Sequence, residues 1–371
     1  MSTHTSTGDS QELPPDSDAA TISTNDSGFE SATSGPANAK EPDPEILIDD
    51  DLESIIEVDH DSDSGYDDGS IRSLTTSLGS LEFEHIHEHG HRYHGSDRVL
   101  LPNDESEQDR LDLQHHILKM CLDGELTATI LPPNVQRIFD VGTGTGIWAI
   151  EMGDKYTSAQ ILGVDISPIQ PEWVPPNVSF EIDDITRPWL RTKDSMDFIH
   201  VRNMVGSIRD WKDLFSEALE HLKPGGRIEV TDIRTQFECL DDTFKERGQA
   251  CAAWKDTFHE IAKGMGMDFD PTPKVPGWLQ EVGFEDVHLE SRVIPVGTWP
   301  RNKKLKGLGA YYLSHMLDGG MENYSMMLFT KAGWDAAAVH ALLAKVRTEL
   351  KDPGMHTFTR ACFVKGRKSL R

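Results

Sequence analysis

The chain has 371 residues and carries 63 acidic against 36 basic side chains, a formal net charge of −27 at neutral pH. Residues 1–90 hold 22 of the acidic and only 2 of the basic side chains, so the first quarter of the chain carries most of the net charge. This balance argues against a nucleic-acid-binding surface, and no stretch approaches the 18 apolar residues that a membrane span requires. We therefore expect neither a nucleic-acid nor a membrane partner.

Residues 1–80 are rich in Ser, Thr, Asp, Gly and Pro and nearly lack aromatic side chains. Such a segment cannot bury enough apolar surface to offset its ordering entropy, so we predict a disordered acidic tail. One stretch differs, because three aliphatic residues at 46–48 directly precede three aspartates at 49–51. An aliphatic run flanked by acids can add as a strand to a partner's sheet. The segment from Ile46 to Asp51 resembles a SUMO-interacting motif; the alternative is a solvated acidic linker.

Five histidines fall within residues 84–95, where His87, Glu88 and His91 match H-E-x-x-H. That motif binds zinc on a helix, which turns both imidazoles toward one metal and leaves the glutamate as base. Gly90 inside the motif weakens a helix, and no third ligand follows at a typical spacing. We therefore expect no metal site and interpret the stretch as a polar segment that leads into a folded domain over residues 81–371.

The folded part alternates between helices and strands. Apolar residues at helical spacing predict a first helix that ends near residue 124. Strands are then predicted around 138–141, 159–167, 177–186, 195–208 and 227–233, with helices starting at 147 and 210. This alternation predicts an open parallel α/β sheet with its ligand at the carboxyl ends of the strands.

A glycine-rich turn links the first strand to its helix and runs from Gly142 through Thr143 and Gly144 to Gly146. Such a turn lets a ligand approach backbone N–H groups at a helix N-terminus. The dinucleotide fingerprint requires its third glycine at position 147, which is isoleucine. Asp140, two residues before the first glycine, would repel a pyrophosphate but suits the ammonium group of S-adenosylmethionine (SAM).

Acidic residues also end the next two strands. Asp165, followed by Ile166, stands where an acid accepts hydrogen bonds from ribose hydroxyls. Asp183, Asp184 and Ile185 follow the third strand, where a carboxylate suits the adenine amine and an aliphatic side chain packs on the ring. A dehydrogenase is the rival interpretation, but the chain has no Tyr-x-x-x-Lys pair, and it has no P-loop motif.

Together these segments resemble a class I SAM-dependent methyltransferase and, more narrowly, the LaeA-type family of fungal methyltransferases linked to secondary metabolism. The resemblance covers about residues 83–368 and includes "RYHG", "FDVGTGTGIWAIEM", "GSIRDW", "LKPGG" and "PVGTWPRNKKLKGLG". It implies a doubly wound, Rossmann-like, seven-stranded sheet, a helical insertion at about residues 300–350, and SAM as cofactor. It also implies that Tyr93 closes over the cofactor; alternatively, Tyr93 only packs its segment on the domain. Arg202, after the fourth strand, is expected to meet the SAM carboxylate.

The last third predicts further helices and a closing strand. Residues 356–368 alternate between apolar and polar side chains and have polar flanks, as an edge-type hairpin strand would. The family fold makes this strand antiparallel. Residues 236–280 and 300–332 are expected to roof the site, where Met and aromatic side chains line an apolar substrate pocket or simply form core. These side chains are Tyr311, Tyr312, Met316, Met326, Met327 and Phe329. The apolar face expected on the last helix comprises Trp334, Ala338, Leu342, Val346 and Leu350.

The methyl group of SAM is already activated, so positioning can supply most of the rate. A general base is needed only for a poor nucleophile such as a hydroxyl. The candidates are His200 and Asp232 near the strand ends and His259 on the following helix. No catalytic residue is assigned from the sequence.

Three functions remain open. We expect methyl transfer to an unidentified small metabolite; the alternatives are a protein methyltransferase and a SAM-binding regulator that acts through protein partners of its acidic tail. The start of the chain has no basic segment followed by an apolar run, so no secretory signal is expected. Four widely spaced cysteines suit a reducing compartment, so we expect an intracellular protein, cytoplasmic or nuclear.

Overall fold

The structure, a computed structural model, describes residues 46–47, 85–95 and 100–371. The predicted disorder of residues 1–80 lies outside these ranges except at two positions. Ile46 and Leu47 form strand β1, which pairs in parallel with a strand at the sheet edge and places Ile46 opposite Leu289. β1 thus occupies an edge of the sheet, where the neighbouring strand offers unpaired N–H and C=O groups to an added strand. The remainder of the SUMO-motif-like segment lies outside the described residues.

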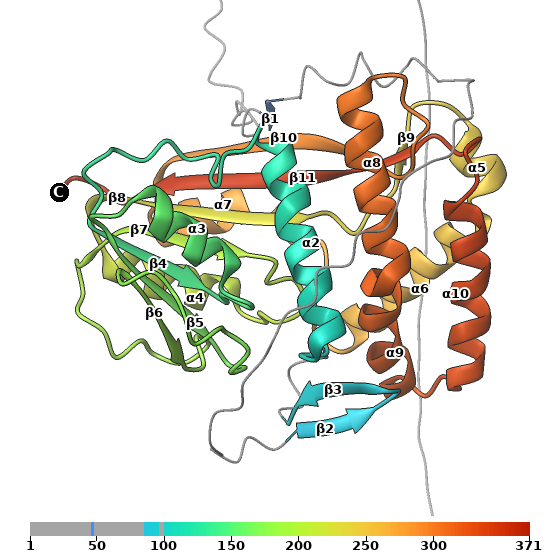
Figure 1. Ribbon diagram of the computed structural model, residues 1–371, viewed down its shortest axis with the longest axis horizontal. Helices are drawn as coiled ribbons and strands as arrows, with labels where there is room; N and C mark the ends of the chain where they lie inside the picture. The colour runs from blue at the N-terminus through green and yellow to red at the C-terminus, as the bar shows by residue number, and fades with distance from the viewer. Residues whose placement is uncertain (1–45, 48–84, 96–99) are drawn as a thin grey trace, which may run out of the picture. The chain divides into compact units, whose positions relative to one another are not determined.

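Nine strands of the described residues form one sheet, with the main order β1-β10-β11-β8-β7-β4-β5-β6 (Figure 1). Strands β4 to β8 run parallel, whereas β11 runs antiparallel to both of its neighbours. This order confirms the predicted doubly wound α/β sheet. The strands are β4 (Arg137–Val141), β5 (Gln160–Asp165), β6 (Val178–Ile182), β7 (Met196–Arg202), β8 (Leu222–Ile233), β9 (Glu238–Cys239, paired with β11), β10 (Glu285–Pro295) and β11 (Thr357–Arg367). A separate hairpin consists of β2 (His85–Glu88) and β3 (His91–His94).

Helices cover both faces of the sheet, because neighbouring residues of a strand point to opposite faces. Ile138 of β4 packs in the cluster that contains Trp148, and Phe139 packs in the cluster that contains Phe215. Helices α6, α8, α9 and α10 pack together beside one end of the sheet (Figure 1). The helices are α2 (Glu105–Cys121), α3 (Ile147–Lys155), α4 (Trp211–His221), α5 (Thr243–Arg247), α6 (Gln249–Gly264), α7 (Val275–Val282), α8 (Lys303–His315), the π-helical turn η1 (Met316–Gly320), α9 (Met321–Lys331) and α10 (Ala336–Leu350). None of the helices in these ranges is long and apolar enough to cross a membrane.

Short-range signals in the sequence set several helix ends. The Asp104 carboxylate accepts the backbone N–H of Glu107 and begins α2, and the Asp210 carboxylate accepts the N–H of Lys212 and begins α4. Gly283 ends α7 at a φ of 115°, which a residue with a Cβ adopts only with strain.

The edge position predicted for the closing strand is wrong, although its antiparallel direction is confirmed. β11 lies between β8 and β10 and is buried along most of its length. Its polar residues suggested an edge, but Lys365 bonds Glu290 at 2.7 Å and Arg360 bonds Glu238 at 3.0 Å. Long basic side chains can cover apolar surface with their stems while the charged ends find partners, so they also occur on an inner strand.

The apolar face predicted for α10 is wrong at Trp334 and Ala338 and only partly right at Leu342, which is half-buried against the core. The buried residues are Val339, Leu343, Val346 and Leu350, and Trp334 lies before the helix, which is capped by Asp335. A strict spacing of four residues drifts by roughly 40° per step around a helix of 3.6 residues per turn. The true stripe alternates spacings of four and three and so stays on one side.

The inner position of β11 predicts the order in which backbone amides exchange with solvent. Amides of residues 361–364 are expected to exchange at least about tenfold more slowly than those of β6, because β11 is paired on both sides and β6 is an edge strand. Hydrogen–deuterium exchange followed by mass spectrometry measures this difference. Equal exchange in the two strands would contradict the order of the sheet.

Candidate functional site

The histidine-rich stretch forms a β-hairpin in place of the helix that H-E-x-x-H needs. Cross-strand pairing places His87 opposite Arg92 and Glu88 opposite His91. Because paired residues share a face and neighbours alternate, His87 and His91 project from opposite faces of the hairpin. No group of three potential metal ligands occurs in the described ranges. The interpretation as a polar leading segment therefore fits the structure.

The glycine turn after β4 is sterically demanding. Gly142, Gly144 and Gly146 have φ values of 71°, 58° and 80°, the left-handed region that favours glycine. A Cβ on Gly142 would lie 2.1 Å from the Met204 sulfur, and one on Gly146 would lie 2.3 Å from the Phe180 ring. The first and third glycines are thus required by both backbone conformation and space. The turn leads directly into α3, whose first N–H groups lack helical partners and attract polar ligand atoms.

Asp165, at the end of β5, fastens this turn from the neighbouring strand. Its Oδ2 accepts the backbone N–H of Gly144 at 2.8 Å, and its Oδ1 accepts that of Ser167 at 2.9 Å. Burial raises the pKa of Asp165, and these two hydrogen bonds oppose the rise. Each carboxylate oxygen retains a lone pair for a further donor.

An open cleft of about 1130 Å³ lies against the turn, and we name it the cofactor cleft. The carboxyl ends of β4, β5, β6 and β7 form its floor, and residues 101–103 with the first turns of α2 form a further wall. The structure brings nine of the sequence-predicted residues to this cleft. They are Gly142, Thr143, Gly144, Asp165, Ile166, Asp183, Asp184, Ile185 and Arg202.

Asp140, which was expected to face an ammonium group, does not line the cleft. Its carboxylate is buried, where Oδ2 accepts the Thr143 hydroxyl at 2.6 Å and Oδ1 accepts His200 Nδ1 at 2.8 Å. The His200 ring in turn stacks on Trp148 with 3.7 Å between ring centroids. Asp140 therefore stabilises the glycine turn through buried hydrogen bonds. His200, a candidate base, is the partner in one of them.

Tyr93 also lies outside the residues that line the cleft. Its side chain is 1% exposed, and its hydroxyl has no hydrogen-bond partner within the described ranges. Burial, with Asp104 next in effect, raises the pKa of Tyr93 to about 12. The tyrosine pairs with Pro102 in an isolated bridge, and Asn103 N–H bonds the carbonyl of Arg92. Tyr93 thus packs the hairpin against the segment that walls the cleft.

Arg202, at the end of β7, reaches the cleft with its guanidinium held by a histidine. Its Nη1 donates to His115 Nδ1 at 2.9 Å, and His115 Nε2 lies 3.4 Å from the Glu151 carboxylate. Burial, and then the positive charge of Arg202, lower the pKa of His115 to about 4. The imidazole is therefore neutral at pH 7, and its Nδ1 accepts a hydrogen bond from the guanidinium.

This contact predicts an unusual titration. The His115 ring resonance is expected to stay constant from pH 8 down to about pH 5 and to shift only near pH 4, as followed by NMR with His115→Gln for assignment. Because the unfolded state takes up this proton near pH 6.5, the stability that neutral His115 contributes is present above that pH. It is lost as the pH falls toward 4. A midpoint near 6.5 in the folded chain would contradict the contact.

A buried ion pair on α2, which the sequence did not reveal, connects the cofactor cleft to helices α8 and α9. Arg110 donates to both carboxylate oxygens of Glu107, at 2.8 and 2.7 Å, and its Nη1 contacts Gln114 and His315 Nε2 at 3.0 and 2.5 Å. Asn323 Nδ2 adds a bond to Glu107 at 2.6 Å. The signal was present, because residues 107, 110 and 114 continue the same helical face as the buried apolar residues of α2.

A second cavity of about 630 Å³, the roof pocket, adjoins the cofactor cleft. Asn203 and Met204 line the cleft, whereas Val205 lines the roof pocket. Gln114, a lining residue of the roof pocket, donates to Asn203 Oδ1 at 3.0 Å across this boundary. The two cavities are therefore separated by the segment that follows β7.

The outcome for the predicted roof side chains is mixed. Tyr312 and Met316 do line the roof pocket. Met326, Met327 and Phe329 are core residues, and Tyr311 is 43% exposed. Spacing along α9 could not separate the two roles, because its buried side comprises more than one face and only part of it meets the pocket.

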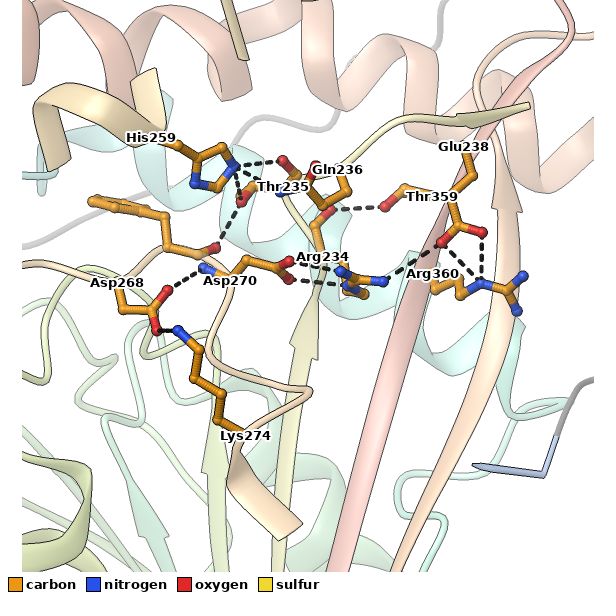
Figure 2. Close-up of polar contacts among 11 residues, drawn as sticks. Arg234, Thr235, Gln236, Glu238, His259, Asp268, Asp270, Lys274, Thr359 and Arg360 are labelled. Atoms are coloured by element: carbon orange, nitrogen blue, oxygen red, sulfur yellow. Dashed lines mark hydrogen bonds and ion pairs between the residues drawn. The ribbon is translucent and has the colours of Figure 1, made fainter. Parts of the chain in front are cut away.

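Figure 2 shows the polar network that fixes one wall of the roof pocket. Arg234 forms a two-point contact with Asp270 at 3.0 and 2.7 Å and approaches Glu238 at 3.6 Å. His259, another candidate base, bonds the carbonyl of Thr235 through Nε2 at 2.9 Å and lines neither the cleft nor the roof pocket. These contacts hold residues 234–236 in place, so His259 supports the wall.

The sheet order and the cleft at the glycine turn define a class I methyltransferase fold, and comparisons with known proteins agree. A family model described as a methyltransferase domain matches residues 113–289. Methyltransferase pytC of Aspergillus terreus is 38% identical over 305 residues, which cover 81% of this chain and 92% of pytC. Secondary metabolism regulator LAE1 of Cochliobolus heterostrophus is 35% identical over 280 residues, with 73% and 91% covered. Protein-methionine methyltransferase laeA of Emericella nidulans is 31% identical over 289 residues, with 76% of each chain covered.

The chain therefore belongs to the LaeA-like methyltransferase family. It is an enzyme of methyl transfer, and SAM is its cofactor.

Proposed function

We propose that this chain transfers the methyl group of SAM to a small, largely apolar metabolite that binds in the roof pocket. The observation that supports this most is the adjoining pair of cavities, which share the short segment 203–205 as a boundary. Methyl transfer needs the nucleophile aligned with the sulfonium, and two fixed sites with a narrow boundary supply that alignment. Several relatives, LAE1 among them, are named secondary metabolism regulators, and we extend the proposal to a secondary metabolite as acceptor.

The glycine turn and the next strand end are proposed to hold the polar parts of SAM. The backbone at Gly142 and Gly144 approaches the cofactor closely because no Cβ intervenes. The N–H groups of residues 142, 143, 144 and 146 already donate within the chain, so the first N–H groups of α3, which lack helical partners, are proposed to meet the cofactor. Asp165 accepts the ribose hydroxyls with its remaining lone pairs.

The remaining cleft residues are proposed to bind the two ends of the cofactor. Ile166 and Ile185 pack against the adenosine, and Asp183 or Asp184 accepts the adenine amine. At the opposite end, Arg202 binds the methionine carboxylate, an ionic contact made stronger by its partial burial.

The lining of the roof pocket favours a small acceptor over a peptide. Its walls come from α6, α8, η1 and residues 232–237 at and after the end of β8, and they are rich in aromatic side chains. Sites for small molecules are typically concave and mostly apolar with a few polar groups, and this pocket fits that description. The alternative regulatory role through partners of the acidic tail rests on residues that lie mainly outside the described ranges.

The SAM site is tested by one substitution at the turn. Gly144→Asp is expected to abolish saturable SAM binding in isothermal titration calorimetry of the full chain. A Cβ at this position has only Leu111 within 4 Å, so the variant keeps room to fold while its side chain enters the cleft. Asp also tolerates the left-handed conformation better than most residues.

Gly266→Asp is the matched control, because Gly266 has a similar φ of 72°, has open space around it, and does not line the cleft. It is expected to bind SAM as the wild-type chain does. If the wild-type chain fails to bind SAM, or if both variants bind equally, the proposed site is wrong.

A protein-methionine acceptor is a second candidate, favoured by one observation. The Met204 side chain lines the cofactor cleft with its sulfur beside Gly142, and the relative from Emericella nidulans is named a protein-methionine methyltransferase. A thioether attacks the methyl carbon as the sulfonium C–S bond breaks, and the products are a methionine sulfonium and S-adenosylhomocysteine. This reaction releases no proton and needs no base.

The two candidates differ in where the methyl group is found. On our proposal, the chain incubated with deuterium-labelled SAM carries no label, and mass spectrometry of the Met204 peptide shows only the unmodified mass. Self-methylation would place one labelled methyl group on that peptide, absent in Met204→Leu. That result would favour the second candidate.

A further inference from the structure

One buried carboxyl group in the roof pocket is only weakly satisfied by the surrounding structure. Asp232, near the end of β8, is 1% exposed, and within the described ranges no hydrogen bond of ordinary geometry reaches either carboxyl oxygen, although the backbone amides of Met204 and Val205 lie near it. It lines the roof pocket. Leaving a buried polar group unsatisfied destabilises a fold, so such a group calls for a functional explanation.

Another buried carboxyl group on the same strand provides the contrast. Glu229 is equally buried, but its two oxygens accept the backbone N–H groups of Ala128 and Thr129 at 3.2 and 2.6 Å. Glu229 is thus explained by the structure alone. Asp232 differs from it in lacking hydrogen bonds of this geometry and in lining the roof pocket.

The surroundings of Asp232 disfavour its charge in the empty pocket. Burial raises the pKa of this carboxyl group well above its usual range, and Asp270 adds to the rise. The backbone amides of Met204 and Val205 and the charge of Arg202 act in the opposite direction but do not cancel it. Tyr324 and His315 line the same pocket as Asp232. Burial raises the pKa of Tyr324 and lowers that of His315, so both side chains are uncharged near neutral pH.

The same pocket holds an unpaired donor. Arg110 carries only N–H donors, so the contact of its Nη1 with His315 Nε2 requires that Nε2 accept. The proton of the neutral imidazole is then on Nδ1, and this nitrogen has no partner among the described residues. The residues that line the pocket therefore include one carboxyl group and one imidazole N–H that no hydrogen bond of ordinary geometry satisfies within the described ranges.

The apolar walls define the shape of the ligand. Phe237, Trp254, Phe258 and Tyr312 surround the pocket with ring faces and edges, which suit a flat molecule. Arg234 is paired with Asp270 and lies 3.6 Å from Glu238, so this part of the wall carries no net positive charge and suits a neutral acceptor.

We propose that the acceptor is a flat, apolar hydroxy-carbonyl compound, that Asp232 takes the proton of its hydroxyl, and that His315 binds its carbonyl oxygen. The chain is then an O-methyltransferase, an inference that rests on the proposed function. The acceptor oxygen attacks the methyl carbon as the carbon–sulfur bond breaks and its electron pair returns to sulfur. The hydroxyl proton passes to the Asp232 carboxylate, and the products are a methyl ether and S-adenosylhomocysteine.

The test uses the full chain with tritiated SAM and two pools of probes. One pool contains hydroxyanthraquinones and hydroxynaphthoquinones, and the other contains the corresponding amino compounds. Label is expected only in the hydroxy pool, at a rate that rises with pH as Asp232 loses its proton. Asp232→Asn is expected to lower kcat by about 10²–10⁴-fold and to flatten the pH profile, with SAM binding unchanged. Asp232→Glu is expected to recover part of the rate.

Glu229→Gln is the matched control, since it alters a buried carboxyl group of the same strand that does not line the roof pocket; it is expected to keep the pH profile. Because Asn has nearly the shape of Asp, the thermal midpoint of Asp232→Asn is expected to equal or exceed that of the wild-type chain. Label in the amino pool, full activity of Asp232→Asn, or a wild-type chain that binds SAM but labels neither pool would overturn the inference. Failure to bind SAM would instead refute the proposed function.

Discussion

The buried ion pair between Arg110 and Glu107 is the contact on which the arrangement of both cavities depends. Glu107 lines the cofactor cleft, and Arg110 reaches His315 of the roof pocket, so one pair of charges spans the two sites. Withdrawing two charges from water is unfavourable unless hydrogen bonds satisfy them, and Gln114 and Asn323 supply further bonds here. Breaking such a pair typically costs about 3–5 kcal/mol, because the remaining charge is left without compensation.

The position of this pair on α2 gives the site its rigidity. Residues 107, 110 and 114 lie along one face of a single helix, so the wall of the cleft, the tautomer of His315 and the bond to Asn203 are set by one rigid element. Methyl transfer by an activated donor depends mainly on alignment. The structure provides alignment through a helix and a strand end that cannot shift independently of each other.

The sequence was sufficient for the parallel half of the sheet and for the location of the cofactor cleft. Buried parallel strands appear as short apolar runs, and their carboxyl ends share one edge, so residues 142–144, 165 and 183–185 could be brought together from topology alone. The inner position of β11 could not be predicted, because the pairing of its charged residues with Glu290 and Glu238 is a long-range property.

The direction of side chains at the site could not be predicted from the sequence either. Asp140 turns toward His200 and Tyr93 turns into the core, and both choices depend on partners distant in the chain. The sequence offered three candidate bases of equal standing. Only the structure shows that His200 and His259 are engaged in supporting contacts, whereas no hydrogen bond of ordinary geometry reaches the Asp232 carboxyl group within the described ranges.

The two cavities draw on different parts of the fold, and this division has an evolutionary consequence. The cofactor cleft is built largely at strand ends, whereas about half of the roof pocket is lined by α6, α8, η1 and α9, which lie outside the sheet. Mutations in those helices can therefore reshape what is methylated while the donor site stays intact. A lineage of such proteins can diversify its chemistry by repacking one layer, and a protein engineer can graft new specificity onto this scaffold at the same layer.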